Sequence, residues 1–250
     1  MKLTYIFHSG FAVETEACIL IFDYWHDPAK VLPNLLLSPK PMYVFSSHFH
    51  EDHFTKKIFE WKANKPNVKY ILSKDILKRH RADKDDADVW LAKGGTWSDA
   101  CLNVTATGSN DSGVSWIIDV DGKRIFHAGD LNNWFSRFLS DEEPSTLIHS
   151  DEIPFGVDPI AEEKAFLGEL KDVRKLTDAF DVAFFPVDGR IGNGYMKGGR
   201  QFLDRFKVNM FVPMHFVASG FESSWRFKNY SDRFGVPFWT ITENGDTLFI

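Results

Sequence analysis

Four side chains of metal-binding type occur within six consecutive residues of the chain. The segment reads His48-Phe49-His50-Glu51-Asp52-His53 and directly follows the apolar run Tyr43–Ser47. In an extended segment, side chains two positions apart point to the same side, so His48 and His50 can face one point. Asp52 and His53 follow where the chain turns and can face a second point nearby. Imidazole and carboxylate ligands suit zinc, iron or manganese, so the segment predicts a site for one or two divalent metal ions, with zinc favoured.

The elements that must position this segment alternate between strands and helices. Short apolar runs predict strands over Leu3–Phe7, Phe11–Glu14, Ile19–Phe22, Val68–Leu72, Asn103–Thr107, Val182–Val187 and Asn209–Met214. Helical spacing of apolar residues predicts helices over Phe54–Asn64, Lys74–Asp86, Ala161–Phe180 and Gly199–Phe206. Asp-Gly and Asn-Gly pairs predict two hairpins, one joining Val114–Val120 to Lys123–His127 and one around Asn244-Gly245. Ser140–Pro159 is expected to be a long loop. This interleaving predicts one α/β domain over residues 1–250.

The overall composition excludes several classes of protein. The 250 residues carry 29 Lys and Arg against 35 Asp and Glu, a net charge of −6, which argues against a dedicated nucleic-acid or anionic-membrane surface. Two cysteines far apart suggest neither a disulfide framework nor a thiolate metal site. We find no signal peptide and no apolar run long enough to span a membrane. We therefore expect a cytoplasmic protein that acts on a small molecule, without nucleic-acid or membrane partners; the oligomeric state is left open.

The His-x-His-x-Asp-His pattern after a strand resembles the metal motif of the metallo-β-lactamase-fold hydrolases. Three further residues match that superfamily in the same order along the chain. Asp23 closes the strand Ile19–Phe22, Asp130 follows Gly129 after an apolar strand, and His215 ends the last predicted strand before the C-terminal hairpin. The resemblance spans nearly the whole chain, but the motif does not specify a substrate.

The resemblance implies a four-layer αββα sandwich with the metal site at one edge of the two sheets. It also implies that His48 and His50 bind a first metal, that Asp52, His53 and His215 bind a second, and that Asp130 bridges both. Asp52 and Asp130 would then be the catalytic carboxylates. Asp23 is expected to orient a ligating imidazole from behind. His8 and His127 either support the site in the same way or are ordinary core histidines.

One departure from the superfamily pattern affects the first metal. The loop that usually supplies a third histidine reads Thr107-Gly108-Ser109-Asn110-Asp111-Ser112-Gly113 and contains none. Asp111 is the expected replacement, with Ser109 and Asn110 as weaker candidates. The alternative is that Asp111 only caps a turn, as aspartate often does. We expect the first site to bind its metal more weakly than the second.

Three functions are compatible with this set of residues. The first is a metal-dependent hydrolase, in which a metal-activated hydroxide attacks an ester, lactone or phosphodiester. The second is a di-iron redox protein, and the third is a non-catalytic metal-binding protein of the same fold. The absence of a Gly-x-Ser-x-Gly elbow and of a His-Glu-x-x-His helix excludes serine hydrolases and zincin proteases. Arg190 lies just before the glycine-rich run Gly192–Gly199, and Lys197 lies within it. Either residue could meet an anionic group of a substrate, but we expect both to be solvated.

Overall fold

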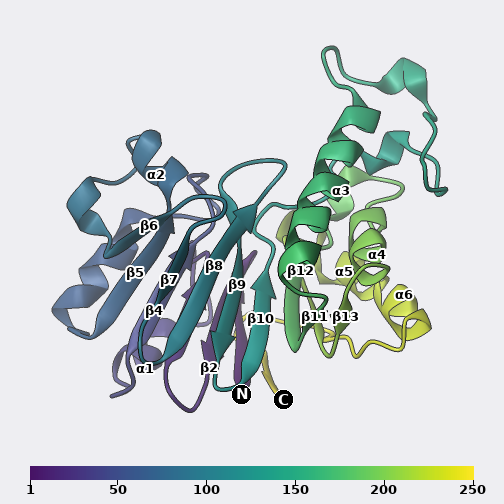
Figure 1. The fold of residues 1–250 in the computed structure, drawn as a ribbon. Helices are drawn as coiled ribbons and strands as arrows, with labels where there is room; N and C mark the ends of the chain where they lie inside the picture. The colour runs from purple at the N-terminus through teal and green to yellow at the C-terminus, as the bar shows by residue number, and fades with distance from the viewer.

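Two large sheets dominate the computed structural model, which describes residues 1–250 (Figure 1). The first sheet has the strand order β15-β1-β2-β3-β4-β5-β6 and the second has the order β14-β12-β10-β9-β8-β7. The strands of the first sheet are β1 Lys2–Phe7, β2 Gly10–Glu14, β3 Ile19–Phe22, β4 Met42–Ser46, β5 Val68–Ser73, β6 Val89–Leu91 and β15 Thr247–Phe249. Those of the second are β7 Thr96–Ser98, β8 Leu102–Gly108, β9 Val114–Val120, β10 Lys123–His127, β12 Val182–Pro186 and β14 Phe211–Met214.

The sheets pack face to face because their buried residues alternate between two cores. In β3, Leu20 and Phe22 belong to the large core between the sheets, whereas Ile19 and Ile21 belong to a second core under helices. In β12 of the other sheet, successive side chains also point to opposite faces. Phe184 lies 5.9 Å from Phe22 across the sandwich, ring centre to ring centre, and Phe185 faces outward toward helix α4. This αββα layering is the predicted fold.

Helices cover the outer faces of both sheets (Figure 1). They are α1 Leu32–Leu36, α2 Lys74–Lys78, α3 Pro159–Leu176, α4 Lys197–Leu203, α5 Phe221–Trp225 and α6 Lys228–Arg233, with 3₁₀ turns at Lys56–Ala63, Lys84–Asp86, Ser136–Phe138, Ser150–Glu152, Gly189–Ile191 and Val217–Ser219. Asp158 caps α3 by accepting hydrogen bonds from two backbone amides of its first turn. None of the helices is long and apolar enough to cross a membrane.

Several predicted helices have different boundaries in the structure. The helix predicted over Ala161–Phe180 ends at Leu176, because Ala179–Phe180 forms β11 and pairs with β13, Lys207–Val208. The helix predicted over Lys74–Asp86 is divided into α2 and a 3₁₀ turn, and the one over Phe54–Asn64 is a 3₁₀ helix over Lys56–Ala63. In the 54–64 segment, the apolar residues Phe54, Ile58 and Trp61 are buried, so their spacing identified the side that faces the core.

The predicted C-terminal hairpin is wrong. A turn does form near Asn244-Gly245, but its two arms join different sheets. After the turn, β15 pairs with β1 at the edge of the first sheet, whereas before it Trp239 donates a backbone hydrogen bond to Phe211 of β14. The segment therefore links the two sheets along one side of the sandwich.

Strand directions bring the predicted site residues to one edge. Strands β3, β4 and β5 are mutually parallel, as are β10, β12 and β14. Because β2 is antiparallel to both β1 and β3, the carboxyl end of β1 also lies at the edge where β3 and β4 end. Loops that follow β1, β3, β4, β10 and β14 therefore meet there, on rigid sheet that can aim their side chains.

Candidate metal centre

Eight His and Asp residues form two adjacent groups at this edge. One group consists of His48, His50, Asp111 and Asp130, and the other of His8, Asp52, His53 and His215. Within each group, one potential ligand atom from every residue lies within 4.8 Å of the others. The structure thus brings together all the residues predicted as ligands, and it adds His8 to them.

Asp130 lies between the two groups and offers one oxygen to each. Its Oδ2 is 3.4 Å from His48 Nε2, in the first group. Its Oδ1 is 3.1 Å from His53 Nε2 and 3.3 Å from His215 Nε2, in the second group. A carboxylate whose two oxygens face two different imidazole clusters has the geometry required to bridge two metal ions.

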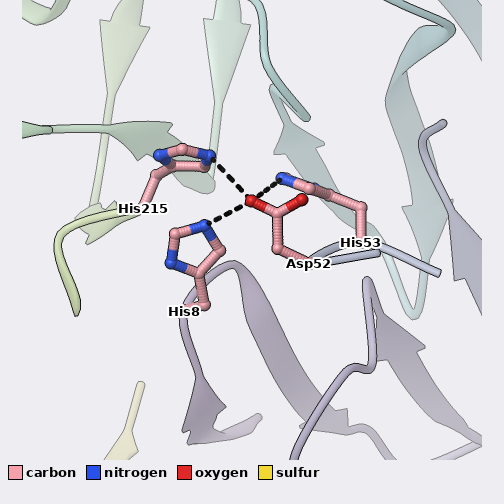
Figure 2. Close-up of side chains that lie close together, drawn as sticks. All are labelled: His8, Asp52, His53 and His215. Atoms are coloured by element: carbon pink, nitrogen blue, oxygen red, sulfur yellow. Dashed lines mark ion pairs between the residues drawn. The ribbon is translucent and has the colours of Figure 1, made fainter. Parts of the chain in front are cut away.

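In the second group, three imidazoles surround the carboxylate of Asp52 (Figure 2). Asp52 Oδ2 lies 3.2 Å from His8 Nε2 and 3.8 Å from the Nε2 atoms of both His53 and His215. The side chains of the three histidines are at most 4% exposed, whereas Asp52 is about one-third exposed. The open side of this group is therefore the side of Asp52.

The first group is more exposed and contains fewer imidazoles. His48 Nε2 and His50 Nδ1 are 2.9 Å apart, and His50 Nδ1 is 3.9 Å from Asp111 Oδ2. Asp111 is 42% exposed. Its backbone amide donates to Ser109 Oγ, but its carboxylate accepts no hydrogen bond from the turn and faces His50 instead. The position of Asp111 thus favours the predicted role as the replacement ligand over that of a turn cap.

Two glycines allow the loops of the first group to approach the motif closely. Gly113 has φ +65°, and a Cβ atom there would lie 2.0 Å from the carbonyl oxygen of Ser47. Gly129, directly before Asp130, has φ +55°, and its Cβ would lie 2.8 Å from the Ser47 side chain. Only glycine fits these contacts without displacing backbone, so both positions fix the placement of Asp111 and Asp130.

Asp23 orients two of the imidazoles from beneath the site. Its fully buried carboxylate accepts hydrogen bonds from His53 Nδ1 at 2.7 Å and from Ser47 Oγ at 2.7 Å. Since Ser47 Oγ donates to Asp23, it can accept from His48 Nδ1, which lies 3.0 Å away. Protons on the Nδ1 atoms leave the Nε2 atoms of His53 and His48 free to act as ligands.

Asp188 performs the corresponding function for His215, and the sequence reasoning missed it. Its buried carboxylate lies 2.9 Å from His215 Nδ1 and also pairs with Arg190. The signal was present in the sequence, because Asp188 follows the apolar strand β12 as Asp23 follows β3. Arg190, predicted to be a solvated charge, is about half exposed, and its guanidinium lies 3.2 Å from His215 Nδ1.

Of the two roles proposed for His127, the structure favours that of a core histidine. His127 is fully buried, stacks on Phe22 and lies 3.0 Å from the carbonyl oxygen of Ser9, so it is a hydrogen-bonded core residue beneath the site.

Lys197 was expected to be solvated, but it is 3% exposed and lies 3.2 Å from Glu163. It also donates to the carbonyl of Ser140, so it anchors the 140–158 loop to α4.

Burial and neighbouring charges favour the ligand forms of several groups. Burial lowers the pKa of His8 to about 4 and that of His48 to about 3, so both imidazoles are neutral near pH 7. For Asp130, burial opposes ionisation, but His53, His215 and His48 hold its pKa well below the usual range. Burial likewise opposes the charged form of His53, but Asp130 and Asp23 raise its pKa well above the usual value.

The residues of the second group fit a divalent metal ion, and the first group offers donors of the same kind. His53 Nε2, His215 Nε2 and Asp130 Oδ1 are all buried, and none has a hydrogen-bond partner. Unpaired buried polar atoms are costly in a folded protein, and these three converge on one point. The donor set of imidazoles and carboxylates is the one that zinc, iron and manganese accept.

Comparisons with known proteins agree with this architecture. No protein-family model and no curated protein sequence matches the chain. Among solved structures, it is similar to Igni18, a novel metallo hydrolase from the archaeon Ignicoccus hospitalis, with 19% identity, a TM-score of 0.66, and 99% of this chain and 97% of that chain covered. It is also similar to the metallo-β-lactamase-fold protein YhfI from Bacillus subtilis, with 13% identity, a TM-score of 0.61 and 99% of each chain covered.

A third similar structure has a different chemistry. CmlA, a diiron β-hydroxylase from Streptomyces venezuelae, matches with 13% identity and a TM-score of 0.58, over all of this chain and 54% of that chain. At these identities the similarity shows the fold. The chain has the metallo-β-lactamase fold, with two groups of potential metal ligands at the edge of its sheets.

Proposed function

We propose that this protein is a metal-dependent hydrolase acting on an ester, lactone or phosphodiester bond of a small cytoplasmic substrate. The observation that carries the proposal is the position of Asp130. Its Oδ2 faces the buried His48 of the first group, and its Oδ1 faces the buried His53 and His215 of the second. The similar metallo hydrolase Igni18 supports the same class of activity.

Each part of the site has a defined task in this proposal. A divalent metal held here would lower the pKa of a water molecule toward 7 and stabilise negative charge on the substrate. Asp130 would hold the two ions at a fixed separation, and Asp23 and Asp188 would keep the imidazole rings in their binding orientation. Trp25 packs against His8 and Trp134 against His215, so aromatic rings shield the second group from water.

The first experiment measures metal content per chain on protein purified without added metal. A panel of esters, lactones and phosphodiesters is then tested with zinc, manganese and iron in turn. We expect Asp52→Ala to lose both metal and activity, whereas Asp151→Ala, on an exposed turn, should retain both. Full metal content and unchanged turnover in Asp52→Ala would contradict the proposal.

A di-iron redox function is the second candidate, and one observation favours it. Asp111 stands where the superfamily usually places a histidine, so three carboxylates contribute to the two groups. Carboxylate-rich sites with imidazole suit iron. The absorption spectrum of protein purified in air separates the two functions, because an oxidised di-iron centre absorbs in the near-ultraviolet and visible range and a zinc centre does not.

A further inference from the structure

We infer that His8 is a direct metal ligand in the second group and that it shifts this site's preference from zinc toward iron(II) or manganese(II). The inference deepens the proposed function and rests on it only for the presence of a metal. It concerns a residue that lies at the end of β1, far in sequence from the His-x-His-x-Asp-His motif.

The environment of the His8 ring lacks the partners that a buried imidazole normally has. The residue is 4% exposed, and neither ring nitrogen makes a hydrogen bond. Its Nε2 lies 3.2 Å from Asp52 Oδ2, but without a hydrogen-bonding geometry. Burying two unpaired polar nitrogens is unfavourable unless another partner is present, and a metal ion at the centre of the group provides one.

The backbone holds His8 in the orientation that aims its ring at the group. His8 has φ +58°, a left-handed conformation that non-glycine residues adopt uncommonly. Its amide donates to the Tyr5 hydroxyl at 2.9 Å, and its carbonyl accepts from the backbone amide of His215. The rings of His8 and His215 are 4.0 Å apart, centre to centre. These contacts fix the ring beside the other three donors (Figure 2).

With His8 included, five protein donors surround the second site. They are the ring nitrogens of His8, His53 and His215, one oxygen of Asp52, and Oδ1 of Asp130. Catalytic zinc is usually held by three protein ligands and a water molecule in tetrahedral geometry. Five donors and one open position instead suit a six-coordinate ion, and imidazole with carboxylate is a set that iron(II) and manganese(II) accept. The first site has only four donors, so the second site should fill first.

A competing role for His8 is to support Asp52 without touching the metal. The two roles differ in the coordination number of the metal, which the absorption of cobalt(II) reports directly. The visible absorption of cobalt(II) becomes stronger as its coordination number falls from six to five and from five to four. This readout does not depend on any substrate.

The experiment adds one equivalent of cobalt(II) to metal-free wild-type protein and to two variants, His8→Asn and His8→Gly. Both replacements tolerate a positive φ, so neither strains the backbone. We expect weak absorption for the wild type and stronger absorption for the variants. We also expect cobalt affinity to be at least about 100-fold lower in the variants, because about 100-fold is the largest loss typical when only a hydrogen-bond partner of a ligand is removed. Added imidazole should restore the wild-type spectrum in His8→Gly. The ratio of zinc to manganese affinity should rise in both variants.

The matched control is His149→Asn, because His149 also has a positive φ but is exposed and belongs to neither group. It should behave as the wild type does. Wild-type spectra and affinities in both His8 variants would overturn the inference, as would weaker binding with no change in coordination number and no rescue by imidazole. A wild-type protein that binds neither cobalt, manganese, iron nor zinc would instead overturn the proposed function.

Discussion

Asp188→Asn tests whether a carboxylate outside the ligand set governs metal affinity at the second site. The wild-type carboxylate is 1% exposed and lies 2.9 Å from His215 Nδ1. Asparagine keeps an oxygen that can accept from Nδ1, so the ring orientation should be retained. What is lost is the negative charge that makes the imidazole a better donor, and in comparable sites such a loss lowers metal affinity about 10- to 100-fold.

That range corresponds to about 1.4–2.8 kcal/mol of metal-binding free energy. Most of it should come from the His215 contact, because the other partner of Asp188, Arg190, is half exposed and its ion pair contributes little. The assay is competition of the second-site metal with a chelator of known affinity. Asp172→Asn is the matched control, since Asp172 is a partly exposed helix residue paired with Lys93 and Lys175.

The pH dependence provides a second check on the same variant. Burial alone would raise the pKa of Asp188, but His215 and Arg190 lower it to about 2. A depressed pKa means that the charged form is present above that value and lost only as the pH falls through it. Titration of Asp188 itself should therefore not change the ratio of wild-type to variant affinity between about pH 5 and 8. An unchanged affinity in Asp188→Asn near pH 8 would refute the reasoning.

Three further predictions concern the bridge, the first site and the anchored loop. Asp130→Asn should lower metal affinity at both sites, since each faces one oxygen of that carboxylate; loss at one site only, measured by metal content, would rule out a bridge. Asp111→Ala should lower the metal affinity of the first site selectively, and Asp111→His should raise its affinity for zinc. Metal titration measures both affinities, and two equally tight sites in both variants would count against Asp111 as a ligand. Burial opposes ionisation of Glu163, but its hydrogen bonds and the charge of Lys197 lower its pKa in the folded protein. The charge of Glu163 therefore stabilises the fold at any pH above its pKa in the unfolded chain, near 4.5. This stabilisation is lost as the pH falls through the lower pKa of the folded protein. Glu163→Gln leaves Lys197 buried without its counter-ion. We expect it to lower the free energy of unfolding by about 3–5 kcal/mol near pH 7 and by less in acid. Denaturant unfolding at several pH values measures this difference.

The sequence by itself determined the features that depend on local spacing. The motif from His48 to His53 and the apolar strands before Asp23, Asp130 and His215 are contiguous patterns. These patterns place each proposed ligand at or just beyond the end of an apolar strand, where a sheet can aim it. The interleaving of apolar strands with helices predicted sheets covered by helices, whereas the four-layer arrangement was predicted from the resemblance to the metallo-β-lactamase fold.

Only the tertiary structure decided the contacts between residues far apart in the chain. His8, at the end of β1, could equally have been a core histidine, and only the packing of β1 beside the motif brings its ring to Asp52. Asp188 acquired its role through the parallel pairing of β12 and β14, which places its carboxylate behind His215. Lys197 and the C-terminal turn were misjudged for the same reason: a charge or a turn is recognised locally, but its burial or pairing depends on which distant segment packs against it.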